Sequence, residues 1–261
     1  MTNPLFYQKP IALDKEVHRA LRIKRNTSDM SFATNTNSVL LAAVEFIPAC
    51  RDYPIVFARV ADGNIVPVAL LGIRKDENLF IVDRLWDAST YVPAFVRRYP
   101  FVPAETSPDN LTICIDEAFP GFSQDEGEPL FEANGDPAPF LQQAIALVQD
   151  YNAECKRTDA FMKRISDLEL LKEMNVRIDL KGGEQFQVAG VWMVDEAKLA
   201  ALDQASIAQL HAAGDLPLIY AHLFSQANLS RVVDRLAARM LLQKSAKLIR
   251  QKAAAVTTQE K

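Results

Sequence analysis

Three apolar runs separated by short polar turns constrain the fold of this chain more than any other feature of its sequence. Residues 55–60, 65–73 and 79–82 are rich in Val, Ile, Leu and Phe, which are common in strands. The sequences between them, DGN and KDEN, are typical turns and too short to hold a helix. Strands joined by such short turns must run antiparallel. The pattern therefore predicts an antiparallel β meander in the N-terminal half.

The second half of the chain changes to a helical pattern. Apolar residues recur every three or four positions over residues 140–172, and Thr158 or Asp159 can cap a second helix there. We therefore expect two helices in this stretch. Residues 38–46 fit a helix or a strand equally well, and we expect Pro48 to end either element.

A second hairpin and a long helix are predicted near the C-terminus. Residues 176–180 and 186–194 are strand-like segments on either side of a Gly-Gly pair, which is a turn signal. From residue 195 onward the pattern is helical, and its longest piece covers 229–255. A short helix over 91–99 and a strand over 110–116 complete the elements that matter below.

Strands and helices are segregated along the chain, so we expect an α+β fold and not a doubly wound parallel sheet. We expect residues 1–255 to form a single integrated domain with a mainly helical C-terminal part. The loop 117–139, rich in Gly, Pro and acid, is the candidate point of subdivision. Residues 256–261 are expected to form a frayed tail.

Composition and charge argue against several classes of function. The formal net charge is -4 and the pI about 5.5, so no global basic field favours binding to nucleic acid. The three cysteines are odd in number and far apart, which disfavours a disulfide framework or a zinc site. The N-terminus shows no signal-peptide pattern, and every apolar run is shorter than the roughly 20 residues of a membrane span. We therefore expect a cytoplasmic protein without a membrane span.

The densest candidate binding site lies within residues 44–59. Functionally, Arg51 could hold a carboxylate or phosphate while Asp52 orients its guanidinium, and Cys50 could act as a nucleophile if Arg51 lowered its pKa. Alternatively, this segment is a turn between a helix and a strand, with Asp52 as a cap, Arg51 in solvent and Cys50 in the core. The candidate binding residues here are Glu45, Cys50, Arg51, Asp52 and Tyr53.

Three further residues are candidates for the same binding site. Arg97 and Tyr99 lie in the sequence YVPAFVRRY, and His222 lies in LIYAHLFSQANL. His222 could be a ligand or a general base, although a histidine packed at a helix end is commoner. The sequence has no phosphate-binding glycine loop, no metal-ligand spacing and no nucleophile elbow, so no catalytic residue and no metal site is predicted. The cofactor remains open.

Charge is distributed unevenly along the chain, which suggests a surface for a partner. Residues 116–136 hold seven acids and no base, whereas 231–252 hold seven bases and one acid. The basic helix is either docked with a solvated face or forms a contact surface for a protein partner or for the acidic loop of a second copy. The predicted surface residues are Arg231, Arg235, Arg239, Lys244, Lys247 and Arg250. Beyond Gln243 the apolar stripe thins, so this end could project from the core.

Three stretches, in this order and spacing, resemble the bacterial SapC family over nearly the whole chain. They begin with FIPACRDYPIVFAR, YVPAFVRRYPFV and FQVAGVWMVDEAKLAAL. The resemblance implies an accessory or binding protein linked to the bacterial envelope, to surface-layer biology or to uptake-related systems, and it carries over no catalytic residue. The alternative is an enzyme of unrecognised type with a small-molecule pocket around Glu45, Arg51, Asp52 and His222.

Overall fold

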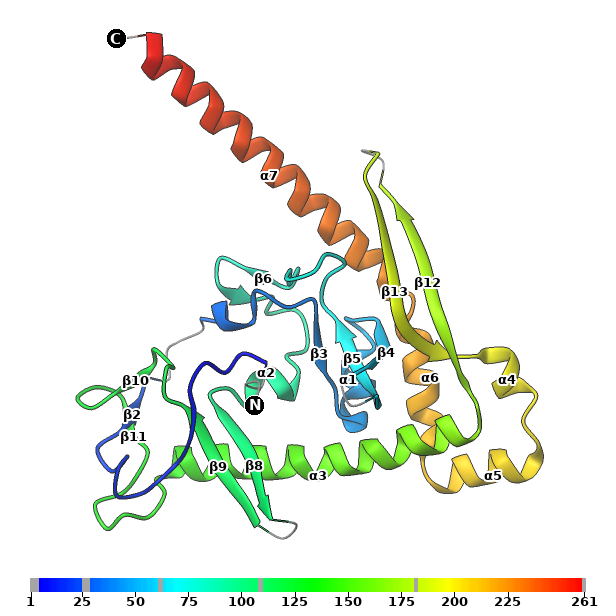
Figure 1. Cartoon of the computed structure of the whole chain (residues 1–261), viewed down its shortest axis with the longest axis horizontal. Helices are drawn as coiled ribbons and strands as arrows, with labels where there is room; N and C mark the ends of the chain where they lie inside the picture. The colour runs from blue at the N-terminus through cyan, green and yellow to red at the C-terminus, as the bar shows by residue number, and fades with distance from the viewer. Residues whose placement is uncertain (1–4, 25–28, 61–62, 108–109, 181–182, 260–261) are drawn as a thin grey trace.

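The computed structural model describes residues 5–24, 29–60, 63–107, 110–180 and 183–259, and its fold is α+β (Figure 1). Two helices are much longer than the rest, α3 (Pro139–Asp167) and α7 (Asn228–Gln259). The short helices are α1 (Phe46–Ala49), α2 (Ala94–Arg97), α4 (Glu196–Ala200), α5 (Gln204–Ala212) and α6 (Asp215–Ser225), with 3-10 turns η1 (Ser31–Ala33) and η2 (Ala43–Glu45). The predicted fold class and the long C-terminal helix are thus confirmed.

The largest sheet combines strands from both halves of the chain. Its order is β12-β13-β4-β5-β3, and every neighbouring pair is antiparallel. The strands are β3 (Ser38–Leu40), β4 (Ile55–Arg59), β5 (Ile65–Leu70), β12 (Leu171–Asp179) and β13 (Gln185–Val194). The second predicted hairpin is therefore present as β12–β13, and it extends the sheet that the first hairpin begins.

The third strand predicted for the meander lies elsewhere. Strand β6 (Ile81–Val82) pairs with β7 (Leu85–Trp86) in a separate two-stranded sheet. The edge of β5 that does not pair with β4 pairs with β3. Asn78 explains the change of direction, because its buried amide donates to the Ala33 carbonyl and accepts from the Phe80 backbone N–H. With β4 and β3 on its two edges, β5 has no edge left to pair with residues 79–82.

Two small sheets flank the N-terminal half of α3. One has the order β1-β9-β8 and the other β10-β2-β11. Their strands are β1 (Pro10–Ala12), β2 (Arg22–Ile23), β8 (Phe101–Ser107), β9 (Asn110–Asp116), β10 (Phe122–Ser123) and β11 (Glu128–Pro129). The segment 117–139, expected to be a loop, thus contributes two short strands that pair with β2.

Helix α3 is continuous, so the prediction of two helices over residues 140–172 was wrong. Thr158 does not cap a new helix. Its hydroxyl donates to the Glu154 carbonyl of the preceding turn at 2.6 Å and accepts from the Ala43 backbone N–H at 2.8 Å. A threonine that bonds backward in this way is compatible with an uninterrupted helix. α3 ends at Asp167, and residues 171 onward form β12.

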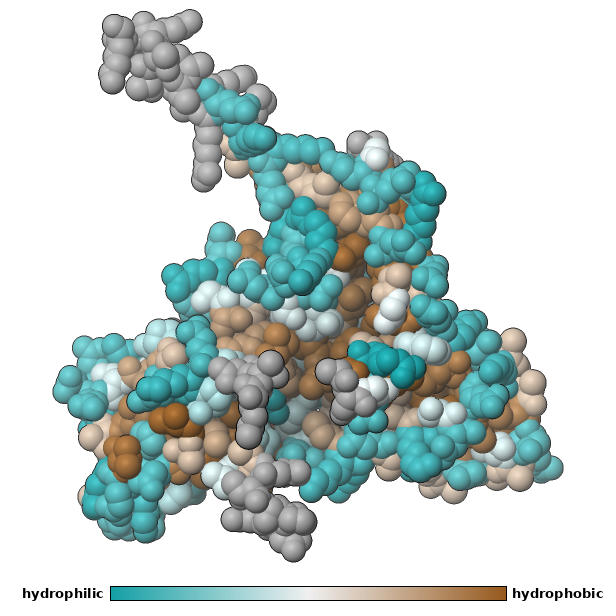
Figure 2. Space-filling model, viewed as in Figure 1, coloured by the Kyte–Doolittle hydropathy of each residue, from teal (hydrophilic) through white to brown (hydrophobic). Residues whose placement is uncertain are grey.

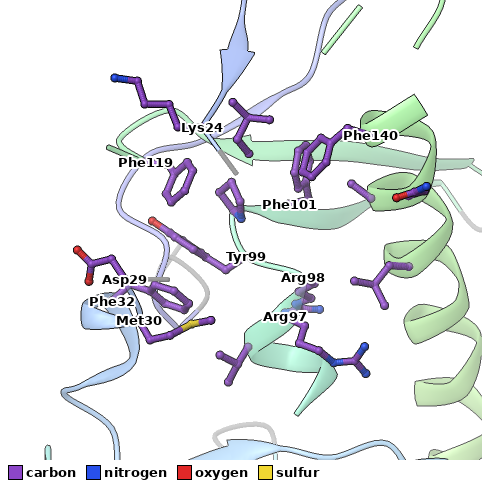
Figure 3. Close-up of a pocket in the computed structure, with 16 residues that line it drawn as sticks. Lys24, Asp29, Met30, Phe32, Arg97, Arg98, Tyr99, Phe101, Phe119 and Phe140 are labelled. Atoms are coloured by element: carbon purple, nitrogen blue, oxygen red, sulfur yellow. The ribbon is translucent and has the colours of Figure 1, made fainter. Parts of the chain in front are cut away.

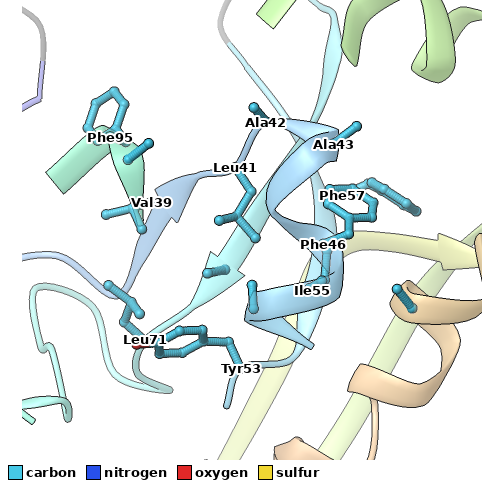
Figure 4. Packing of buried hydrophobic residues seen from close by; sticks show 14 of the residues in the cluster. Val39, Leu41, Ala42, Ala43, Phe46, Tyr53, Ile55, Phe57, Leu71 and Phe95 are labelled. Carbon is cyan, nitrogen blue, oxygen red and sulfur yellow. The ribbon is translucent and has the colours of Figure 1, made fainter. Parts of the chain in front are cut away.

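The core lies between the large sheet, α1, α3 and α6. Figure 4 shows Phe46, Tyr53, Ile55, Phe57 and Leu71 packed together, and each of these side chains is fully buried. Burying each one contributes about 2 kcal/mol. Contrary to expectation, Pro48 lies inside α1 and does not end it. In so short a helix its missing N–H falls within the first turn, where no intrahelical bond is required.

An ion pair joins α3 to α6 at the border of this core. Arg164 donates through two nitrogens to the Asp215 carboxylate, at 2.6 and 2.8 Å. The Asp215 side chain is buried, whereas Arg164 is partly exposed. The hydrogen bonds to Asp215 raise the pKa of Arg164.

Substitution of Arg164 by Met should lower the free energy of unfolding by about 3 kcal/mol, because it leaves the buried Asp215 carboxylate without its cation. Arg157→Met is the matched control on the same helix, since Arg157 pairs with Glu154 on the surface. It should leave the free energy nearly unchanged. Urea denaturation measures both variants, and equal effects would contradict the assignment.

Candidate functional site

The segment that contains Glu45, predicted as a binding site, is a structural junction. Glu45 is buried, and its carboxylate accepts three hydrogen bonds. They come from the Ala42 backbone N–H at 2.9 Å, the Tyr91 hydroxyl at 2.9 Å and the Ala94 backbone N–H at 2.7 Å. Glu45 therefore closes the η2 turn and also caps the start of α2. Both carboxylate oxygens thus accept hydrogen bonds from groups within the protein.

Asp52 and Tyr53 hold the same distant segment. The buried Asp52 carboxylate accepts from the Tyr91 backbone N–H at 2.8 Å, and the Tyr53 hydroxyl donates to the Tyr91 carbonyl. Tyr53 also accepts from the indole N–H of Trp86 at 3.1 Å. Burial raises the pKa of Tyr53, so the hydroxyl stays protonated as a donor. These residues fix the chain at Tyr91, just before α2.

Cys50 and Arg51 do not form a reactive pair. The Cys50 thiol is partly buried and donates to the Ile47 carbonyl at 3.2 Å, and burial raises its pKa above the ordinary value. A nucleophilic thiol needs the opposite shift. Arg51 is exposed, and its carbonyl accepts from Arg231 of α7. These contacts favour the reading of the segment as a turn.

His222 lies in the core. Its Nε2 accepts from the Val194 backbone N–H at 3.0 Å, and its ring stacks on Phe57 with centroids 4.6 Å apart. Burial lowers the pKa of His222 to about 4, so the imidazole is neutral at pH 7. Because His222 is buried and Arg51 is exposed, the structure does not bring them together in one site.

A cavity of about 470 Å³ lies between α2, the N-terminal half of α3 and the small sheets (Figure 3). This volume is in the range of small-molecule sites. Five aromatic residues and three basic residues are among the sixteen that form its wall. The cavity is lined by Ile23, Lys24, Asp29, Met30, Phe32, Val96, Arg97, Arg98, Tyr99, Pro100, Phe101, Phe119, Phe140, Gln143, Ala144 and Leu147. It is the candidate functional site, and we call it the aromatic cavity.

Two of the predicted binding residues, Arg97 and Tyr99, line the aromatic cavity. Tyr99 stacks on Phe32 at 4.1 Å between centroids and meets the edge of Phe119 at 5.5 Å. Its hydroxyl donates to buried Asp116 at 3.0 Å, and burial raises its pKa. Arg97 is exposed and donates to the Val92 carbonyl at 3.0 Å.

Sequence reasoning missed Arg98, which also lines the cavity. Its guanidinium lies beside the rings of Phe95 and Tyr151, with its central carbon 4.3 and 5.0 Å from their centroids. The signal was present as two adjacent arginines in an otherwise apolar and aromatic stretch. A four-residue helix offers too little periodicity to show which arginine faces inward.

The basic helix α7 is anchored by three of its predicted surface residues. Arg231 donates to the Arg51 carbonyl at 2.5 Å, and Arg235 pairs with Asp87 at 2.6 Å. Arg239 donates to the carbonyls of Asn78 and Ile81 at 2.8 and 2.6 Å. These three guanidinium groups therefore contact their own chain, and their use by a partner stays a prediction.

Farther along, α7 projects from the rest of the protein (Figure 1). Figure 2 shows hydrophilic residues along this projecting part. Lys244 pairs with Glu184 beside the β12–β13 hairpin at 2.9 Å, and Lys247 is exposed. The side chain of Arg250 lies outside the described residues. Three large apolar side chains here are mostly exposed: Leu241, Leu242 and Ile249.

Comparison with known proteins gives one match. The SapC family model matches residues 13–232. No curated protein and no solved structure matches the chain. Within the described residues, no group of three or more His, Cys, Asp or Glu is placed to hold a metal ion. No described helix has the length and apolar character that a membrane crossing requires.

The buried His222 predicts a loss of stability in mild acid. Its pKa is 6.5 ordinarily and about 4 in the folded chain. Between these values the unfolded chain binds a proton that the folded chain does not. The contribution of His222 to the free energy of unfolding is therefore fully present above pH 6.5. It decreases by about 3 kcal/mol as the pH falls toward 4. Denaturation of the wild type and of His222→Gln over this range measures the difference. The exposed His211→Gln should behave like the wild type, and an unchanged slope in His222→Gln would contradict the assignment.

Proposed function

The chain belongs to the SapC family, and from this premise we propose that it is an accessory protein that binds a small apolar molecule in the aromatic cavity. The observation that carries the proposal is the cavity itself, with a volume of about 470 Å³ and a mostly apolar wall that includes four phenylalanine rings and one tyrosine ring. Apolar walls with a few polar groups are characteristic of ligand sites. We place this role in a cytoplasmic protein that serves an envelope or uptake-related system.

A binding role explains the polar residues better than a catalytic one does. Glu45 and Asp52 accept hydrogen bonds from backbone and tyrosine groups, and His222 accepts from a backbone N–H. A general base must keep a lone pair available to its substrate. The side chains that border the aromatic cavity offer stacking surfaces and cationic groups, which are suited to holding a ligand.

Filling the cavity should abolish binding. Ala144 lines the cavity from α3, so Ala144→Trp places an indole in the space that a ligand would occupy. We expect the affinity for 2-naphthylmethanol, a flat apolar probe, to fall at least about tenfold because the site is blocked. Isothermal titration calorimetry measures this loss.

Ala146→Trp is the matched control for this experiment. Ala146 is exposed on the same helix and does not line the cavity, so its substitution should leave probe binding unchanged. Circular dichroism checks that both variants remain folded. Equal binding by the wild type and Ala144→Trp would show that the probe binds elsewhere, and absence of binding by the wild type would contradict the proposed function.

The projecting part of α7 favours a second candidate function, the binding of an acidic protein partner. No acidic residue occurs between Asp234 and Glu260, whereas lysines and arginines recur along this helix. The same part of the helix exposes Leu241, Leu242 and Ile249, so its surface is both apolar and basic. A partner with acidic residues around an apolar strip would match it, while a second copy of α7 would be repelled by like charge.

Removal of residues 244–261 should weaken such a complex. The full chain and a chain ending at Gln243 serve as immobilised baits, at low and at high salt. We expect an acidic protein to be retained only by the full chain and to be released by salt, because screening weakens exposed charge pairs. Retention of the same protein by the shorter bait would contradict this role, and so would self-association of the full chain in sedimentation equilibrium.

A further inference from the structure

Arg98 gives the aromatic cavity a chemical preference that its apolar walls alone do not have. We infer that the ligand is a planar apolar carboxylate, whose anionic end meets Arg98 while its flat body lies among the aromatic rings. This inference rests on the proposed function, because it names the class of molecule that the same cavity binds.

The Arg98 side chain is buried without a matching anion. Arg98 is only 8% exposed, and its Nε is buried and has no hydrogen-bond partner in the part of the chain that the structure describes. Arg98 forms no ion pair with a carboxylate among those residues, and the polar side chain beside its guanidinium is the neutral Tyr7 hydroxyl. A buried cation with an unused donor costs free energy unless something compensates for it. An anion in the cavity would provide that compensation.

The rings beside Arg98 keep its guanidinium in place. The rings of Phe95 and Tyr151 lie 4.3 and 5.0 Å from its central carbon, and such contacts stabilise a cation. The centroids of these two rings are only 6.5 Å apart, so the rings do not enclose the guanidinium from opposite sides. The two terminal nitrogens of a guanidinium can donate together to the two oxygens of a carboxylate. This geometry favours a carboxylate over a neutral oxygen.

The other charged residues of the cavity already have partners. Lys24 pairs with Glu126 at 2.7 Å, and Asp29 pairs with Arg84. Arg97 donates to the Val92 carbonyl and to the Tyr91 hydroxyl. Arg97 is exposed to solvent, so among the described charged groups of the cavity Arg98 is the one that is both buried and without an ion pair. This places the anionic end of the ligand inside the cavity.

The aromatic residues define the rest of the ligand. Phe32 and Tyr99 are nearly parallel, at 22° between their planes, and Phe119 meets Tyr99 edge-on. Phe101 and Phe140 also line the cavity, with their ring centroids 6.2 Å apart. Rings arranged in this way favour a flat body that can stack or insert edge-on. Figure 3 shows these rings around the same space as Arg98.

Two probes of nearly equal shape test the inference. 2-Naphthoate carries a carboxylate where 2-naphthylmethanol carries a neutral hydroxyl group. We expect the full-length chain to bind the naphthoate at least about tenfold more tightly in calorimetry, because a charge-assisted pair replaces a neutral contact. Arg98→Met should remove this preference and leave the affinity for the neutral probe within about threefold of the wild type. The neutral probe thereby reports that the cavity is intact.

Arg157→Met is the matched control, because it removes the same charge from the surface of α3, where Arg157 pairs with Glu154 and does not line the cavity. It should keep most of the preference for naphthoate, and an equal loss in both variants would overturn the role of Arg98. If Arg98→Met does not fold, Arg98→Lys decides the question. Lysine keeps the charge and lacks the paired donors, so the preference should fall at least about threefold, and an unchanged preference would overturn the inference.

The two levels of the proposal fail in different ways. If neither probe binds, or Ala144→Trp blocks neither, the cavity is not a ligand site and the proposed function is wrong. If both probes bind equally well to the wild type and Ala144→Trp blocks both, the cavity binds apolar molecules but the inferred carboxylate preference is wrong.

Discussion

The aromatic cavity depends on the buried carboxylate of Glu45. Helix α2 has four residues and cannot be stable alone, because an isolated turn of helix costs more conformational entropy than its few hydrogen bonds return. Glu45 caps its start through Ala94, and Asp52 holds Tyr91, three residues before Ala94. The chain then leaves α2 through Arg97, Arg98 and Tyr99, which line the cavity. The position of these three side chains thus follows from two acids more than 40 residues earlier in the sequence.

This arrangement shows how far the sequence could locate the site. The cluster from Glu45 to Tyr53 was recognisable, because several polar residues lie beside apolar runs. Their role was not recognisable. Apart from the Ala42 N–H, the groups that the Glu45, Asp52 and Tyr53 side chains bind lie 33 to 49 residues away along the chain. A buried carboxylate that caps a distant helix and one that awaits a substrate have the same local sequence. Arg97 and Tyr99 were identified, whereas Arg98 could be separated from Arg97 only by the direction of its side chain.

The fold shows the same division between local and distant information. The hairpins β4–β5 and β12–β13 follow from turn residues and strand propensity, which are local. The pairing of β13 with β4 and of β3 with β5 joins segments far apart, and no turn specifies it. The prediction that Thr158 caps a second helix was wrong for a related reason. A threonine can cap a helix or bond back within it, and the Ala43 N–H that occupies its hydroxyl is 115 residues away.

The cavity and helix α7 are connected through two adjacent residues of the same junction. The Asp52 carboxylate holds Tyr91 at the start of the segment that leads to the cavity, and the Arg51 carbonyl accepts a hydrogen bond from Arg231 of α7. Arg235 adds a second attachment of α7 through its ion pair with Asp87, which lies four residues before Tyr91 in the sequence. A ligand that shifted residues 91–99 would therefore act on Tyr91. Tyr91 is hydrogen-bonded to Asp52, the neighbour of Arg51, which holds α7. Such contiguity is a physical requirement for coupling, and coupling itself would appear as a reciprocal change in the two affinities.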